Sequence, residues 1–136
     1  DDYAVVHVLW QEATLDEAVG RPGGDVLKLT RDPGLFLVAR SEDGAVVGTV
    51  TGDWDGRRAY VYHLAVGPEC RRRGVADALM DELGHGPGVG AVKAKLQILV
   101  DNEASRAFFT HRGYLRESDC EPWGTELVRG GAPPCR

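Results

Sequence analysis

Three adjacent arginines, Arg71, Arg72 and Arg73, stand directly before Gly74 and an apolar helical pattern. Arginine carries a charged fork of N–H donors that matches phosphate oxygens, and glycine lets the backbone approach a ligand closely. The first N–H groups of a helix lack partners within the helix, and the helix dipole adds positive potential there. The stretch therefore predicts a cradle for a phosphate-bearing anion. A solvated surface loop with Gly74 as a simple turn residue is the alternative, and spacing alone does not separate the two.

The elements around this stretch have the order that such a cradle needs, which is strand, tight turn and helix. Residues 59–66 alternate as a strand, and residues 74–84 carry apolar side chains at helical spacing. Residues 35–41 and 45–52 predict an antiparallel hairpin ahead of them. Residues 93–100 predict a strand after the helix, parallel to residues 59–66 because a helical crossover joins them.

Further elements are predicted towards both ends of the chain. Residues 2–13 predict a helix whose apolar face is formed by Val5, Val6, Leu9 and Ala13. A second helix is predicted from Asn102, a good N-cap, to Arg112, and a last strand over residues 124–129. Residues 130–136 predict a frayed tail. The result is one domain over residues 1–136 of the α/β (α+β) class, with a mixed, mostly antiparallel sheet and flanking helices.

The composition narrows the classes of partner. A formal net charge of -5 argues against non-specific nucleic-acid binding and favours a cationic or amine-bearing partner. No apolar run is long enough for a membrane helix, and no secretory signal pattern is present. The three cysteines form no CxxC pair, so neither a disulfide framework nor a metal site is indicated. We therefore expect a cytoplasmic protein without a metal.

Two segments resemble the motifs of a known family. Residues 64–80 resemble motif A of the GNAT N-acetyltransferase superfamily, L-x-V-x-P-x-x-[QR]-x-x-G-x-[GA], with matches at Leu64, Val66, Pro68, Arg71, Gly74 and Ala76. Residues 101–114 resemble motif B, with Asn102, Ala104, Phe108, Gly113 and Tyr114 in register. The resemblance covers roughly residues 2–129 and is strongest to a group of small bacterial acetyltransferases. In the family pattern a strand precedes the first helix, whereas here residue 1 already stands at the helix start.

The resemblance implies acetyl-CoA as cofactor and a GNAT-like strand–helix–strand unit that binds it. By this analogy the backbone of Leu64, Ala65 and Val66 holds the pantetheine arm as an extra strand, beside a bulge that splays the sheet. The Leu64 N–H polarises the thioester carbonyl and stabilises the oxyanion. The pyrophosphate lies on the N–H groups of Arg71, Arg72, Arg73, Gly74, Val75 and Ala76. The pantetheine and thiol are bordered by Asn102, Ser105, Phe108 and Phe109.

The proton-transfer positions depart from the family pattern. Many members place a tyrosine four residues before the motif B glycine, and here that residue is Phe109. Some relatives that acetylate protein N-termini carry a glutamate five residues before the motif B asparagine, and here it is Gln97. Neither side chain moves a proton, so we consider Tyr62, which shares a strand face with Tyr60, as a catalytic residue. His63 has a suitable pKa but equally fits a hydrogen-bonded structural residue. Core or pocket-wall positions are predicted for the tryptophans, Trp10, Trp54 and Trp123.

Two functions from different classes follow from these residues. The first is an N-acetyltransferase that moves an acetyl group from acetyl-CoA to a primary amine by direct transfer in a ternary complex. It would depend mainly on positioning, with water or Tyr62 relaying protons. The second is an acyl-CoA-binding sensor or a degenerate, catalytically weak member of the same fold, which the absent tyrosine and glutamate favour. A domain of this fold that binds no CoA is a third option. Homodimers are common among relatives, so a homodimer is one possible assembly.

Overall fold

The computed structural model describes residues 4–6, 8, 9, 31, 33–85 and 90–125. The chain groups into two compact units, Asp1–Gln97 and Ile98–Arg136. The first contains a four-stranded sheet and helix α3, and the second contains helix α4. The single domain expected over residues 1–136 stays a prediction.

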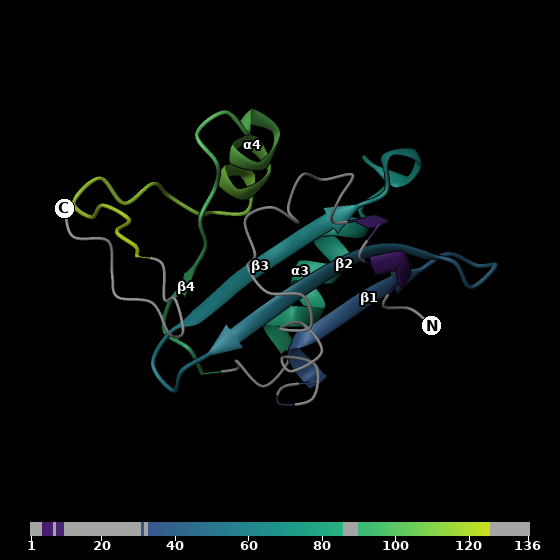
Figure 1. Ribbon diagram of the computed structural model, residues 1–136, viewed down its shortest axis with the longest axis horizontal. Helices are drawn as coiled ribbons and strands as arrows, with labels where there is room; N and C mark the ends of the chain where they lie inside the picture. The colour runs from purple at the N-terminus through teal and green to yellow at the C-terminus, as the bar shows by residue number, and fades with distance from the viewer. Residues whose placement is uncertain (1–3, 7, 10–30, 32, 86–89, 126–136) are drawn as a thin grey trace, which may run out of the picture. The chain divides into compact units, whose positions relative to one another are not determined.

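The sheet has the order β1-β2-β3-β4 (Figure 1). Strands β1 (Phe36–Arg40), β2 (Val46–Trp54) and β3 (Ala59–Val66) form an antiparallel meander, as the alternating sequence pattern predicts. A short 3-10 turn, η2 (Pro33–Leu35), precedes β1. Strand β4 (Ala94–Lys95) pairs with β3 in parallel, so the sheet is mixed and mostly antiparallel.

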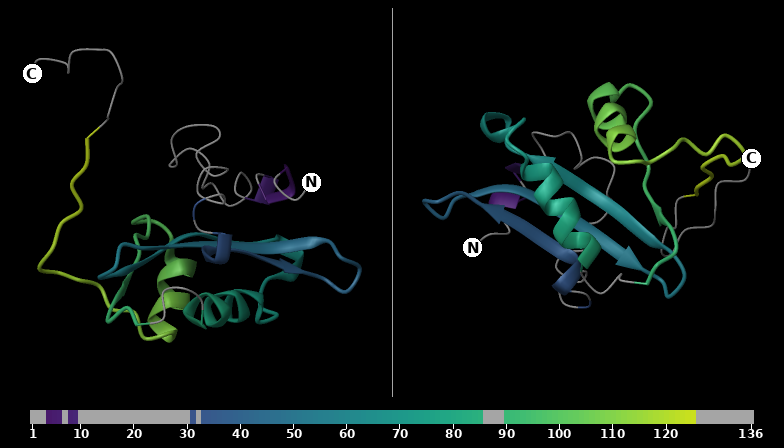
Figure 2. Two further views of the ribbon diagram at one scale, coloured as in Figure 1. Left: turned by 90° about the horizontal axis from the view of Figure 1, so that it is seen from below. Right: turned by 180° about the vertical axis from the view of Figure 1, so that it is seen from behind.

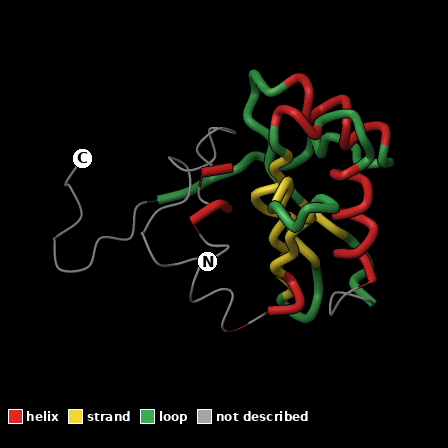
Figure 3. The backbone as a smooth tube through the Cα atoms, turned by 90° about the vertical axis from the view of Figure 1, so that its right-hand side faces the viewer, coloured by secondary structure: helices red, strands yellow, loops and turns green. Residues whose placement is uncertain are grey.

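Helix α3 (Val75–His85) covers one face of this sheet, and the described helical residues 4–6, 8 and 9 lie on the other (Figure 2). Figure 3 shows the same layers with the strands between red helical segments. On the α3 side Leu79, Met80 and Leu83 are buried. On the opposite side Val6 packs against Ala65 and partly buried residues of β1 and β2. Val5 is 45% exposed, so the predicted apolar face of the first helix was wrong at that residue.

Glycines of β2 bring α3 close to the sheet. A Cβ atom on Gly48 would lie 3.0 Å from Val75 Cγ1 and 3.2 Å from the Ala65 carbonyl oxygen. One on Gly52 would lie 2.9 Å from Leu83 Cδ1. The missing side chains therefore set how closely α3 approaches β2. The turn that joins β3 to α3 carries the predicted cradle.

This close packing gives a stability prediction with opposite signs for two glycines. Gly48→Ala is expected to lower the free energy of unfolding by about 1–3 kcal/mol, because a backbone oxygen and α3 leave no room for a methyl group. Gly84→Ala is expected to raise it by about 0.5–1 kcal/mol, because Gly84 is helical and its Cβ would meet nothing within 4 Å. Urea denaturation of both variants measures the difference, and equal shifts would contradict the packing argument.

Strand β4 is much shorter than the strand predicted over residues 93–100. It pairs with β3 only at Ala59↔Ala94 and Tyr60↔Lys95. Residues 96–100 are mostly apolar and fit a strand pattern. However, β3 pairs with no described residue after Lys95, and a bulge interrupts β3 a few residues beyond Tyr60. The prediction was therefore wrong for residues 96–100 because a strand needs a partner as well as a pattern.

In the C-terminal unit, α4 (Glu103–His111) begins where it was predicted to begin. The Asn102 side-chain oxygen accepts a hydrogen bond from the Ser105 N–H at 3.1 Å, which is an N-cap. Phe109 is the buried residue of this helix. The predicted last strand is absent at residues 124 and 125, and its remainder lies outside the described residues. Trp123 is 89% exposed, so its prediction as a core or pocket residue was wrong.

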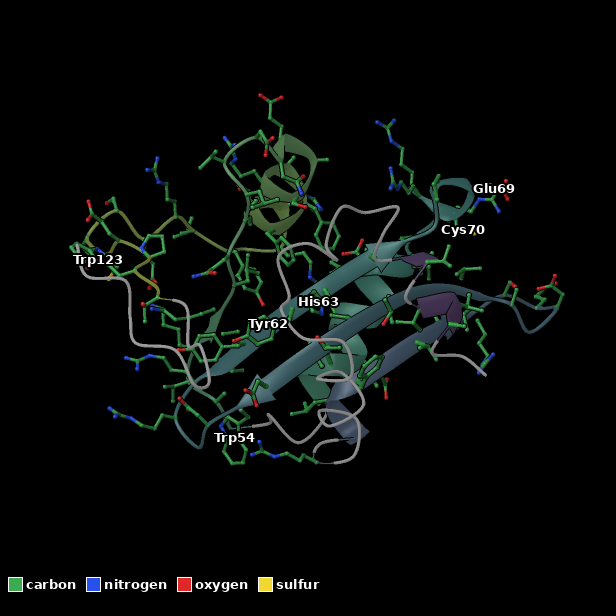
Figure 4. The ribbon with its side chains drawn as sticks, viewed as in Figure 1. Trp54, Tyr62, His63, Glu69, Cys70 and Trp123 are labelled. Atoms are coloured by element: carbon green, nitrogen blue, oxygen red, sulfur yellow. The ribbon has the colours of Figure 1, made fainter. Side chains whose placement is uncertain are left out.

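Several other predictions concern residues that the structure does not describe. Trp10, residues 11–13 at the end of the first predicted helix and residues 14–30 lie outside the described residues. Trp54 ends β2, a central strand, and is 42% exposed, which makes it a surface residue and not a core residue (Figure 4). Across the described residues, no helix is long and apolar enough to cross a membrane. No group of metal-ligating side chains was found in that same part of the chain.

Candidate functional site

A β-bulge lies in the middle of β3. Its register against β2 passes from Thr51↔Tyr62 to Thr49↔Ala65, so two residues, His63 and Leu64, stand opposite Val50 alone. His63 has a positive φ of 51°, a conformation that a residue with a side chain rarely adopts. Such outliers persist only where the surrounding structure enforces them, and they cluster at functional sites. The bulge therefore marks the centre of β3 as the first place to search for a site.

The edge of β3 beside β4 becomes open just before this bulge. Pairing with β4 ends at Tyr60, and among the described residues no strand pairs with that edge from Val61 to Val66. An unpaired strand edge offers N–H and C=O groups to any extended ligand. Among the described residues the edge of β3 therefore has no strand partner along Leu64, Ala65 and Val66, and this backbone runs directly into the arginine turn.

The turn between β3 and α3 is tight. Residues Pro68–Cys70 form a 3-10 turn, η3, that is tied down by the Cys70 N–H to the Gly67 carbonyl oxygen at 2.9 Å. Figure 4 shows Glu69 and Cys70 beyond the end of β3. The Gly67 N–H in turn donates to the Val47 carbonyl oxygen at 2.8 Å. This anchoring fixes where the following four residues begin.

Two residues of this turn have left-handed backbone conformations. Arg72 has φ 62° and Gly74 has φ 80°. Alternation of left-handed and ordinary residues turns successive N–H groups towards one side, which is how backbone nests bind anions. A Cβ on Gly74 would meet nothing within 4 Å, so the space beside its backbone is open.

The N–H groups of this turn find no backbone acceptor among the described residues. The first hydrogen bond of α3 runs from the Ala78 N–H to the Gly74 carbonyl oxygen at 3.0 Å. In the part of the chain that the structure describes, no acceptor is recorded for the N–H groups of residues 72–76. These are the orphan donors of a helix N-terminus, with the positive end of the helix dipole behind them.

The three arginine side chains of this turn differ in their contacts. Arg71 donates from Nε to the Val66 carbonyl oxygen at 3.3 Å, which holds the turn against the end of β3. All three arginines are exposed. The arginine of motif A thus holds the turn, while Arg72 and Arg73 add positive charge to the same segment.

Two tyrosines of β3 share the face opposite α3. The rings of Tyr60 and Tyr62 stack with centroids 6.1 Å apart, as the predicted alternation requires. Burial, and after it the charge of Asp53 and the presence of Tyr60, raise the pKa of Tyr62. Its hydroxyl therefore keeps its proton at neutral pH, which suits a proton donor and excludes a base. Figure 4 shows Tyr62 beside His63, where the bulge interrupts the alternation.

The motif B residues are organised around α4. Asn102 caps the helix and Ser105 supplies the N–H that the cap accepts. The ring of Phe109 makes edge contacts with Phe108 and Tyr114, at centroid distances of 5.0 and 5.2 Å. Burial also raises the pKa of Tyr114. Gln97, the other departure from the family pattern, is exposed.

Comparison with known proteins assigns the fold and the motifs to one family. The model of the Acetyltransferase (GNAT) family matches residues 3–114. The chain belongs to the GNAT acetyltransferase family. An acetyltransferase of Pectobacterium atrosepticum is 36% identical over 130 residues, which cover 94% of this chain and 91% of that protein.

Solved structures confirm the GNAT fold class. Ard1 from Thermoplasma volcanium has a TM-score of 0.73 at 25% identity, covering 86% of this chain and 78% of its own. The diaminobutyrate acetyltransferase EctA from Paenibacillus lautus, solved with its substrate L-2,4-diaminobutyric acid and coenzyme A, has a TM-score of 0.65. At 22% identity, over 82% of this chain and 68% of that one, it supports the fold alone. As a GNAT acetyltransferase, this protein takes its acetyl group from acetyl-CoA, the predicted cofactor.

One residue that no sequence pattern singled out lies on β2, opposite the start of this acetyltransferase's bulge. Thr51 is 4% exposed, and its hydroxyl donates to the Tyr62 carbonyl oxygen at 3.1 Å. From the sequence, a threonine in a strand looks like an ordinary core residue. Its hydrogen-bond partner is a backbone atom of another strand, which the sequence does not indicate. Only the register of β2 against β3 shows what it supports.

Proposed function

We propose that this GNAT acetyltransferase transfers the acetyl group of acetyl-CoA directly to a primary amine, with both bound in a ternary complex. The observation that carries the proposal is the continuous path from the open edge of β3 into the N–H cluster before α3. The edge suits the extended pantetheine arm, and the cluster suits the pyrophosphate. An amine acceptor agrees with the family and with the chain's net charge of -5.

The residues present fit this cofactor. Open space beside Gly74 admits the pyrophosphate to N–H groups that lack acceptors, from Arg72 to Ala76. The exposed guanidinium groups of Arg72 and Arg73 add charge-assisted donors. The backbone of Leu64, Ala65 and Val66 holds the pantetheine arm, and the Leu64 N–H donates to the thioester carbonyl oxygen. In the C-terminal unit, we assign the borders of the pantetheine and thiol to Asn102, Ser105, Phe108 and Phe109.

Bound acetyl-CoA supplies an activated acetyl group, and the chain supplies position and protons. Orientation of two reactants contributes about 7–11 kcal/mol to lowering a barrier, so a dedicated base is not indispensable. Tyr62 keeps its proton at neutral pH, because burial raises its pKa further above the ordinary tyrosine value of 10.0. It therefore serves as a proton donor or relay, while water accepts the proton that the amine loses.

The second candidate is an acyl-CoA sensor or a catalytically weak member of the family. Phe109 favours it, because a buried phenylalanine replaces the tyrosine of the family pattern and packs against Phe108 and Tyr114. Such a protein would bind acetyl-CoA through the same backbone groups without accelerating acetyl transfer.

A thiol-release assay separates the two candidates. The purified protein is mixed with acetyl-CoA and a panel of polyamines, aminoglycosides, lysine and peptides with open N-termini, and free CoA thiol is measured. We expect release above background with at least one amine and none when every amine is omitted. Tight acetyl-CoA binding by calorimetry without thiol release across the panel would favour the sensor. No binding at all would overturn both.

The remaining assignments rest on the composition. We propose a cytoplasmic protein of bacterial type that uses no nucleic acid or membrane partner, since its charge is negative and its cysteines form no framework. A homodimer is a further proposal, and sedimentation at several protein concentrations tests it.

A further inference from the structure

A side chain of β2 contacts the backbone of β3 at the residue where the bulge begins. With two residues opposite Val50, the peptide groups around His63 are rotated out of the regular pattern, as its φ of 51° shows. Buried backbone oxygens need a donor. The Tyr62 carbonyl oxygen, at the start of the bulge, receives one from the Thr51 hydroxyl at 3.1 Å.

Thr51 is well placed to hold this geometry. It is Tyr62's cross-strand partner, and its side chain is 4% exposed. A β-branched residue has few rotamers, so packing fixes the direction of its hydroxyl. The hydrogen bond therefore constrains the peptide that immediately precedes His63, and through His63 it constrains the orientation of the Leu64 N–H.

The same strand contains a nearly identical threonine at the other end of the bulge, and its hydroxyl donates away from β3. Thr49 is 0% exposed and lies on the same face of β2. Its hydroxyl also donates to a backbone carbonyl oxygen at 3.1 Å, but that oxygen belongs to Leu37 on β1. The two side chains share residue type, burial and hydrogen-bond length, and they differ in which neighbouring strand they hold.

We propose that Thr51 is a positioning residue that holds the β3 bulge in the conformation presenting the Leu64 N–H to the thioester carbonyl. The inference rests on the proposed function, because it assigns Thr51 a part in polarising the acetyl group. Thr51 itself touches neither substrate, and it acts through the Tyr62 carbonyl and the two residues that follow it.

Thr51→Val and Thr49→Val form a matched pair that tests this inference. Each removes one buried hydroxyl and keeps the shape of the side chain. We expect Thr51→Val to lower kcat by about 10- to 100-fold, since a small misplacement of a catalytic donor costs that much. KM for acetyl-CoA should change by less than about 3-fold, because the contacts to the pyrophosphate remain. Thr49→Val should keep kcat within about 3-fold of the parent protein.

Infrared spectroscopy tests the contact between the Leu64 N–H and the thioester carbonyl without catalytic turnover. Acetyl-CoA labelled with carbon-13 at the acetyl carbonyl is bound to each protein, and the carbonyl stretch is compared with that of the unbound molecule. We expect a shift to lower wavenumber in the parent protein and in Thr49→Val, and a smaller shift in Thr51→Val. Thr51→Ser keeps the hydroxyl and should restore both the shift and kcat, and the Ser and Ala variants at residue 51 replace the Val variant if it does not fold.

The outcomes separate the inference from the proposed function. If the parent protein releases thiol and the two valine variants lose equal activity, or lose none, the positioning role of Thr51 is wrong while the acetyltransferase proposal stands. If acetyl-CoA binds without any carbonyl shift in the parent protein, the Leu64 contact and the role of Thr51 are both overturned. If acetyl-CoA does not bind, the proposed function is wrong as well.

Discussion

Gly74→Val is expected to weaken acetyl-CoA binding by at least about 100-fold. The substituted side chain would fill the open space beside the turn and keep the pyrophosphate from the N–H groups before α3. Hydrogen bonds to a charged group contribute about 1.5–3 kcal/mol each, so losing two of them accounts for an effect of this size. Isothermal titration of the purified variant with acetyl-CoA measures it.

Backbone strain has to be separated from this blocked approach. Gly74 has φ 80°, so any side chain there costs about 1–2 kcal/mol in the folded state. Gly56 is the matched control, because it has φ 90° and a Cβ there would also meet nothing within 4 Å. Gly56→Val should lose similar stability and bind acetyl-CoA normally. A folded Gly74→Val protein that binds as the parent does would show that the cradle is elsewhere.

Phe109→Tyr is expected to raise kcat by about 10-fold or more. It places a phenol where the family pattern has a tyrosine, and general acids contribute typically about 100- to 10,000-fold. We expect a gain below this range, because a departing thiolate with a pKa near that of cysteine, about 8.5, needs less help than an alkoxide. Steady-state kinetics with the best amine of the panel measures the gain, with KM for acetyl-CoA unchanged.

Packing decides whether the phenol can act. Phe109 is buried against Phe108 and Tyr114, so the new hydroxyl has to leave this cluster to reach a substrate. Phe109→Leu removes the ring without adding a hydroxyl, and its kcat should not exceed that of the parent protein. An unchanged kcat in Phe109→Tyr would mean that proton donation to the thiolate does not limit the rate, and Tyr62 or water would then suffice.

Local patterns predicted the elements well where they carry their own signals. The alternation of residues 59–66 predicted β3, and Asn102 marked the start of α4, because strand alternation and N-caps are encoded within a few residues. The motif around Gly74 predicted the strand–turn–helix order for the same reason. Patterns failed at residues 96–100 and at Trp123, where the outcome depends on whether another element offers a partner.

The sequence by itself determined the family and the cofactor, because the residues of motif A and motif B stand at the required spacing along the chain. Only the tertiary structure decided how the centre of β3 is shaped. The bulge at His63 exists in the register between two strands, and its carbonyl is held by Thr51 from the neighbouring strand. Such a contact joins residues that are distant along the chain and of ordinary type, so no pattern of spacing predicts it.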